Sequence, residues 1–151
     1  DVQCIFPALG PLSKCFHTKF ITTSPIARMP DSEFIQFHAE TAGENAIRNG
    51  VDGIRILQSD GLSAITDKDY SIILSNPPYH SDFSVAKNFI EEGFKRLRIG
   101  GKMIMVTKRL DWYKNKLTSV FGGAMVYTKD GYFVFVSEKR HPFTAKKSKR
   151  R

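Results

Sequence analysis

The sequence predicts an α/β fold in which an open, mostly parallel sheet is doubly wound by helices and ends in an antiparallel hairpin. An apolar run at residues 70–75 stops at two consecutive prolines, which is typical of a buried strand with an abrupt end. Helical and strand patterns alternate from residue 33 to residue 121, as they do in parallel sheets. Two short apolar runs then flank a turn sequence at residues 129–131, which predicts the hairpin.

The predicted elements follow one another closely. Helical periodicity begins at Glu33 and ends at Asn49 and Gly50, and the glycine suits a left-handed C-terminal cap. A strand is predicted at 51–57. Strand 70–75 should be buried on both faces. A helix at about 84–97 is followed by a turn at 100–101, a strand at 103–106 and a helix through residues 117–121. The apolar positions of the helix at 84–97 predict a single buried face: Ala86, Phe89, Ile90, Gly93, Phe94 and Leu97.

The first 30 residues are atypical of this pattern. Residues 2–6 have a strand composition, residues 7–11 predict a loop, and a helix is predicted from about residue 12 to residue 20. Thr22, Thr23 and Ser24 are interpreted as loop residues. We therefore predict one domain at 1–138, the size of a common compact domain.

Positive charge is concentrated in the residues C-terminal to this domain. The net charge is +8, and residues 139–151 contain seven Lys or Arg residues and no acid, which leaves about +1 for residues 1–138. Such a tail can bind phosphate backbones without reading sequence. The alternative is a solvated, disordered end.

Composition favours a soluble cytoplasmic protein. Hydrophobic residues make up 41% and charged residues 25% of the chain. No apolar run reaches the length of about 18 residues that a membrane span needs, and the N-terminus does not have a signal-peptide pattern. Cys4 and Cys15 lack the spacing of metal ligands, so we expect reduced thiols and no metal site.

The most informative motif follows the strand at 70–75. The side-chain oxygen of Asn76 and the main-chain carbonyl of Pro77 can accept hydrogen bonds from a planar NH2 group, and Pro78 helps to fix their direction. Tyr79 can stack on the plane that carries this group. The motif predicts chemistry at an exocyclic or amide nitrogen. The alternative is a strand that ends in an ordinary proline turn.

The motif at 76–79, the segment 44–50 and the turn at 100–101 together resemble the methyltransferase small-domain family. This family belongs to the class I S-adenosylmethionine-dependent methyltransferases, and the chain is most similar to its ribosomal RNA guanine-N2 methyltransferases. The resemblance implies a Rossmann-like fold, S-adenosylmethionine as cofactor and guanine N2 of ribosomal RNA as methyl acceptor. It also implies these catalytic residues: Asn76, Pro77, Pro78 and Tyr79.

The family carries a glycine-rich loop after its first strand, because side chains there would collide with the cofactor. Aligned by position after residues 2–6, only Gly10 matches this loop, and Cys4 stands where the family has an acid. The resemblance therefore assigns Gly10 to the cofactor site, and the rest of the loop departs from the family.

Other cofactor residues are implied by the resemblance. Glu33, with Asp31 as a near alternative, takes the place of the acid that binds the ribose; both acids could instead stabilise the first turn of a helix. Asp60 takes the place of the acid that binds the adenine amine, although a Ser-Asp-Gly sequence is also common in turns. Asn76 would lie next to the methyl group of the bound cofactor.

Substrate-binding residues are expected near the same motif. His80 follows it directly, and the loop at 108–113 mixes cations with aromatic rings, as RNA-binding surfaces do. We expect Lys108, Arg109 and Trp112 to contact RNA, while Trp112 could instead pack against its own helix.

Two other functions use the same features. A protein-glutamine or adenine-N6 methyltransferase would place a different planar amide or amine on Asn76. A catalytically inactive RNA-binding module with this fold would explain the missing glycines near residues 6–9.

Overall fold

The computed structural model describes residues 2–6, 20–24, 40–41, 43–50, 55–59, 61–77 and 83–142. Residues 40–41 and 43–48 are helical. The other elements are β1 (Val2–Phe6), β2 (Phe20–Ser24), β3 (Arg55–Gln58), β4 (Tyr70–Ser75), α2 (Phe83–Arg96), β5 (Leu97–Thr107), α3 (Asp111–Phe121), β6 (Met125–Lys129) and β7 (Tyr132–Glu138).

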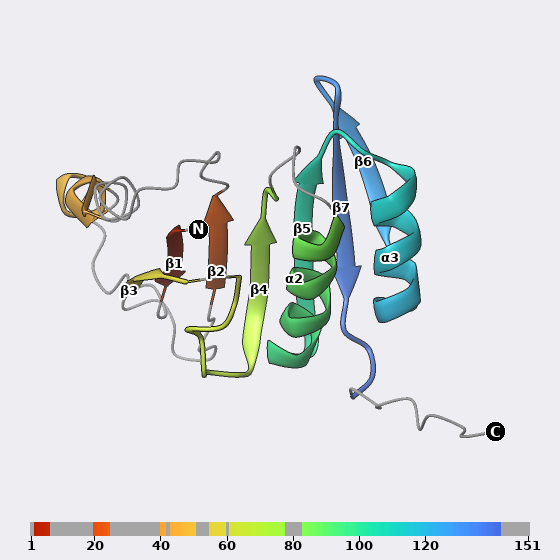
Figure 1. Ribbon diagram of the computed structural model, residues 1–151, viewed down its shortest axis with the longest axis horizontal. Coiled ribbons are helices and arrows are strands. Elements are labelled where there is room, and N and C mark those ends of the chain that lie inside the picture. Colours follow the sequence, from red (N-terminus) through yellow and green to blue (C-terminus); the bar gives the residue numbers. More distant parts are fainter. Residues whose placement is uncertain are drawn as a thin grey trace.

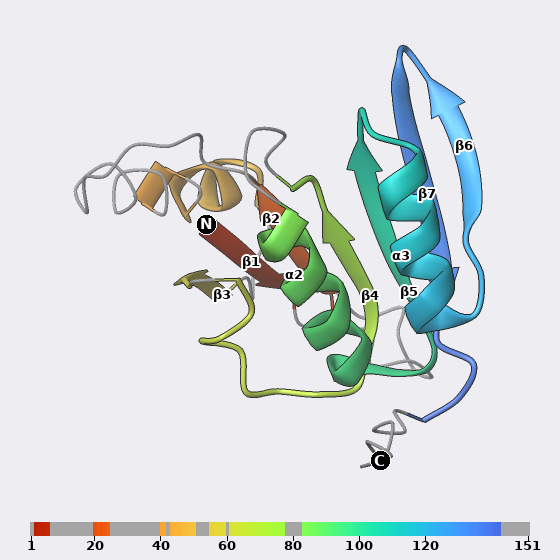
Figure 2. The same cartoon turned by 45° about the vertical axis from the view of Figure 1, so that its right-hand side comes forward.

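The strands form one sheet in the order β3-β1-β2-β4-β5-β7-β6 (Figure 1). β4 pairs in parallel with β2 and β5, whereas β7 is antiparallel to β5 and to β6. The predicted α/β sheet and its antiparallel C-terminal hairpin are confirmed, but the sheet is mixed rather than mostly parallel, because β1 is also antiparallel to both of its neighbours. Helices α2 and α3 lie side by side on one face of the sheet (Figure 2).

The N-terminal part differs from the prediction. Residues 20–24 form a strand, whereas we expected a helix that reached residue 20 and a loop at Thr22, Thr23 and Ser24. The threonines were interpreted by their polarity, but they are β-branched and follow Phe20 and Ile21, a composition that favours extended backbone. The predicted strand at 2–6 is confirmed as β1, but β2, not β1, lies beside β4.

The direction of each strand decides which edge of the sheet its following residues reach. β1 is antiparallel to β2 and β3, so Phe6 lies level with Phe20 and, across β2, with the beginning of β4 at Ile72. β2, β3, β4 and β5 all end at the opposite edge, where β7 begins. We call this the carboxyl edge. Open α/β sheets bind their ligands at this edge.

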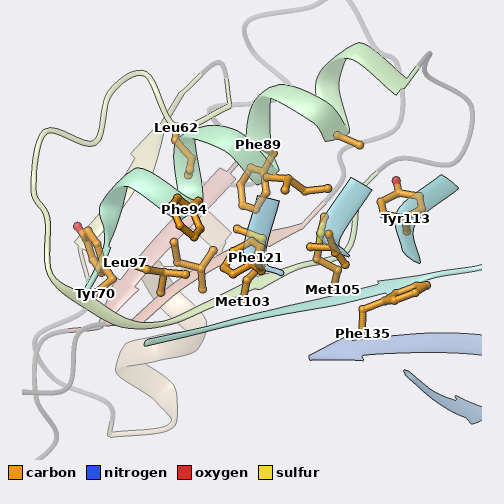
Figure 3. Packing of buried hydrophobic residues seen from close by; sticks show 14 of the residues in the cluster. Leu62, Tyr70, Phe89, Phe94, Leu97, Met103, Met105, Tyr113, Phe121 and Phe135 are labelled. Carbon is orange, nitrogen blue, oxygen red and sulfur yellow. The ribbon is translucent and has the colours of Figure 1, made fainter. Parts of the chain in front are cut away.

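The face of the sheet toward α2 carries the core. Ile73, Met103 and Phe135 are fully buried there, and Phe94 of α2 meets Phe121 of α3 edge-to-face with 4.9 Å between the ring centroids (Figure 3). The predicted buried stripe of α2 is confirmed, although the helix ends at Arg96 and the buried Leu97 begins β5. A Cβ at Gly93 would overlap the end of the Met103 side chain, so glycine lets α2 approach the sheet.

The opposite face is less covered. Leu74 of β4 is 36% exposed, so the prediction that β4 is buried on both faces holds for one face only. The reason is that both complete helices among the described residues lie on the side of Ile73.

None of the described helices is long and apolar enough to cross a membrane.

The turns at Gly50 and at Asp130–Gly131 have the backbone conformations that the sequence predicts. Gly50 has a φ of 62° and its N–H donates to the Ile47 carbonyl, which confirms the left-handed cap of the preceding helix. Asp130 and Gly131 have φ angles of 50° and 78° and join β6 to β7, as a two-residue hairpin turn requires. The turn expected at 100–101 lies within β5, where a Cβ on Gly101 would come within 2.8 Å of the Tyr70 carbonyl oxygen.

A buried lysine joins the end of β7 to the beginning of β5. The Lys139 side chain is 6% exposed, its Nζ donates to the Leu97 carbonyl at 2.7 Å, and the same nitrogen lies 4.9 Å from the centroid of the Phe94 ring. The Gly100 N–H donates to the Lys139 carbonyl at 2.8 Å, and the Lys139 N–H donates to the Gly101 carbonyl. Burial lowers the pKa of Lys139, and the charge of Asp69 offsets part of this effect.

This burial predicts a pH dependence. Because the pKa of Lys139 is lower in the folded chain than its ordinary value of 10.5, the unfolded chain binds more protons between the two values. The free energy of unfolding should therefore rise with pH through this window, and below it the cost of the buried charge stays constant. We expect wild type to gain stability relative to Lys139→Met as the pH rises toward 10.5, measured by urea unfolding. Parallel stability-versus-pH curves for Lys139→Met and wild type would contradict this prediction.

Candidate functional site

Asn76 and Pro77 lie at the carboxyl edge, immediately after the last residue of β4. Pro77 is buried, Asn76 is half-buried, and the preceding Ser75 is 6% exposed. The strand therefore holds Asn76 in place and leaves part of its side chain accessible. Pro78, Tyr79 and His80 lie outside the described residues, so their predicted roles stay predictions.

The loop after β5 reaches the same edge, because β5 is parallel to β4. Thr107 is 1% exposed, and its hydroxyl oxygen accepts a hydrogen bond from the Arg109 N–H at 3.2 Å. This contact fixes the turn from which Lys108 and Arg109 project, and both side chains are exposed. The two predicted cations thus lie at the edge that carries Asn76.

A stack of rings supports this loop. The Phe83 and Trp112 rings stack with centroids 4.3 Å apart and planes at 16°, and Tyr113 meets Trp112 edge-to-face at 5.0 Å. The Arg109 guanidinium carbon lies 5.1 Å from the centroid of the Phe83 ring. Trp112 is half-buried against the core, so the structure favours its packing role over a direct contact with RNA.

The strand β3 brings a third segment to this edge. Ser59, directly after β3, is 7% exposed, and its hydroxyl oxygen accepts a hydrogen bond from the Ala64 N–H at 2.9 Å. Gly61 has a φ of 54°, as the predicted turn requires. Asp60 lies between them, outside the described residues, so its role in binding adenine is not tested.

Sequence reasoning missed the residue that anchors this turn. Arg96 donates from Nη2 to the Leu62 carbonyl at 3.1 Å and from Nε to the Ile65 carbonyl at 3.0 Å. It also pairs with Glu92, whose pKa is lowered by hydrogen bonds from Lys95 and then from Arg96. The four-residue spacing of Glu92 and Arg96 on one helix was the available signal.

Comparison with known proteins places the fold and this edge in a family. Residues 23–137 match the model of the methyltransferase small domain. The sheet and its helices have the methyltransferase fold. The chain belongs to the methyltransferase small domain family.

Similar proteins include methyltransferases of ribosomal RNA. The ribosomal RNA small subunit methyltransferase C of Shewanella amazonensis is 33% identical over 97 residues, which are 61% of this chain and 28% of that protein. A T. thermophilus 16S rRNA N2 methyltransferase, solved in complex with AdoMet and guanosine, aligns with a TM-score of 0.61 and 28% identity. That alignment covers 68% of this chain and 29% of the other. The chain thus spans less than a third of the length of these relatives.

A second kind of relative matches a short segment only. Carbon monoxide dehydrogenase 1 of Methanosarcina mazei is 56% identical over 46 residues, which are 30% of this chain and 7% of that enzyme. Because the match covers so small a share of that enzyme, it supports no conclusion about the activity of this chain.

The fit to S-adenosylmethionine is uneven around the edge. Ser59 after β3 and Asn76 after β4 place polar residues at this edge. The sequence contains no glycine between Ser24, the last residue of β2, and Gly43, so the segment after β2 lacks the residue type that a backbone cradle favours. Gly10 and Glu33 lie outside the described residues.

The ring stack predicts a measurable contribution to stability. Trp112→Ala should lower the free energy of unfolding by about 2 kcal/mol, less than for a fully buried tryptophan, because Phe83 and the core lose their neighbour. Urea unfolding followed by circular dichroism measures this, since the variant lacks the chain's single tryptophan. The 56% exposed Tyr127 provides the matched control, and Tyr127→Ala should cost less than about 0.5 kcal/mol. Equal losses in the two variants would show that the stack does not support the loop.

Proposed function

We propose that this chain belongs to an S-adenosylmethionine-dependent methyltransferase that modifies the exocyclic N2 amine of a guanine in ribosomal RNA. The observation that carries the proposal is the place of Asn76 and Pro77 directly after β4, at the carboxyl edge of a methyltransferase small domain. The similarity to a 16S rRNA N2 methyltransferase that binds AdoMet and guanosine supports guanine as the acceptor base.

The role proposed for the two residues follows from their acceptors. A guanine N2 amine has two N–H groups, and it can donate one to the Asn76 side-chain oxygen and one to the Pro77 carbonyl. These bonds would turn the nitrogen lone pair out of the ring plane and toward the methyl donor. S-adenosylmethionine, when bound, supplies a methyl group on a sulfonium that leaves readily. Positioning therefore contributes most of the rate enhancement, and no strong base is required.

The remaining site residues are proposed from their place in the sequence. Asp60, between Ser59 and Gly61, would accept a hydrogen bond from the adenine amine, and Asn76 would border the methyl group. Tyr79, beyond Pro78, would stack on the guanine ring, and His80 would help to hold the substrate.

The test of this proposal is Asn76→Ala. We expect methyl transfer to ribosomal RNA to fall by about 100- to 1000-fold, because the transition state loses one of its two acceptors. The affinity for S-adenosylmethionine should change little. Mass spectrometry of nucleosides from the digested RNA measures the rate and identifies the methylated atom.

The matched control is Asn88→Ala, which removes the same side chain from the exposed surface of α2. This variant should retain wild-type turnover. Unchanged turnover in Asn76→Ala would remove that residue from the mechanism, and N6-methyladenine as the product would reassign the acceptor.

One observation favours a second candidate function. The missing glycines near residues 6–9, where only Gly10 matches the glycine-rich loop of the family, favour a catalytically inactive RNA-binding module with this fold. RNA binding without any S-adenosylmethionine binding, in a chain shown to be folded, would support this alternative.

A further inference from the structure

A cavity of about 240 Å³ lies where α3, β6 and β7 meet. Its walls come from the end of α3, the start of β6 and the end of β7, together with Lys102 of β5. Because β7 begins at the carboxyl edge and runs away from it, the cavity lies at the other end of the hairpin. It is therefore separate from the site proposed around Asn76.

Part of the cavity lining is apolar. Phe121 is 2% exposed, and its ring is held edge-to-face on Phe94 with 4.9 Å between the centroids. Met125 and Val136 lie opposite each other in the pairing of β6 with β7, and both line the cavity. Small-molecule sites usually exceed about 300 Å³, so this cavity suits a compact ligand with an apolar body.

Three charged side chains line the same cavity. Lys102 of β5 lies opposite Glu138 of β7 in the pairing of these strands, and Arg140 follows two residues after Glu138. Lys102 and Arg140 are exposed, and Glu138 is half-buried. In the part of the chain that the structure describes, none of the three forms an ion pair. Charges of both signs thus remain available to a ligand.

We propose that this cavity binds a free α-amino acid with an apolar side chain. Lys102 and Arg140 donate hydrogen bonds to its carboxylate, and the Glu138 carboxylate accepts a hydrogen bond from its ammonium group. The apolar side chain of the ligand lies against the apolar lining. Only a free amino acid carries both charges on one carbon atom, because peptide bonds neutralise both groups in a residue within a chain.

The experiment is a titration of the isotope-labelled full chain with L-phenylalanine, followed by NMR of the main-chain amides. We expect saturable shifts that include the amides of Gly123 and Glu138, which line the cavity. Because water screens the exposed charges, the dissociation constant should be on the order of 1 mM.

Three analogues of phenylalanine test which groups the cavity recognises. Phenylpropionate lacks the ammonium group, phenethylamine lacks the carboxylate, and glycine lacks the apolar side chain. Each should bind at least about threefold more weakly than phenylalanine, because each leaves one part of the lining without its partner.

The matching variants remove one charge each with little change in shape. Lys102→Gln, Glu138→Gln and Arg140→Gln should each weaken phenylalanine binding by about three- to fivefold. Arg98→Gln is the matched control, since Arg98 is exposed on β5 and does not line the cavity. It should bind as wild type does, and the amide spectrum of each variant shows whether it is folded.

The outcomes decide the proposal without reference to methyl transfer. Shifts that do not saturate, or are absent, at about 20 mM phenylalanine would overturn it. Equal affinities for phenylpropionate and phenylalanine would also overturn it, because such a site would ignore the ammonium group. A loss in Arg98→Gln as large as in Lys102→Gln would show a general effect of charge and would contradict the site. Selective loss in the three lining variants would support the site even in a chain that transfers no methyl group.

Discussion

The parallel pairing of β4 with β2 on one side and β5 on the other is the constraint on which the site depends. Together with the antiparallel pairing of β1 with β2 and β3, it sends the residues after β3, β4 and β5 to one edge, so the turn after Ser59, Asn76 and Arg109 share this edge although they lie far apart in the sequence. The helices contribute by fixing β4 and β5 through a dry core on one face. A shift of β5 by one residue would turn Met103 and Met105 to the other face of the sheet.

Arg96 shows how the helix and the edge are connected. A single guanidinium binds two carbonyls of the turn after β3 and a carboxylate of its own helix, so α2 positions a segment more than 30 residues away. Lys139 has the same effect at the opposite end of the sheet, where it closes β7 against the start of β5. Both cations are hydrogen-bonded inside the protein, so each connects two separate segments of the chain.

Much of the C-terminal two thirds could be predicted from sequence, because local signals and tertiary packing agree there. The stripe of α2, the left-handed Gly50 and the Asp130–Gly131 turn each demand one conformation, and the structure adopts it. The site could be predicted only to the extent that the sequence shows where each strand ends and which residues follow it. The contacts of Phe83 with Trp112 and Arg109 depend on how two elements approach, which no periodicity contains. The strand β2 was not predicted for another reason. Thr22 and Thr23 suit a loop by their polarity and a strand by their β-branched shape, and only pairing with β4 decides between the two.

The central claim is that this edge serves a methyltransferase, and calorimetric titration of the full chain with S-adenosylmethionine and its demethylated product tests it most directly. We predict binding with a dissociation constant on the order of 10 to 100 μM, because Asp60 and Asn76 match the family in sequence while only Gly10 matches its glycine-rich loop. A chain that is folded by circular dichroism and binds neither compound at about 1 mM would contradict the claim.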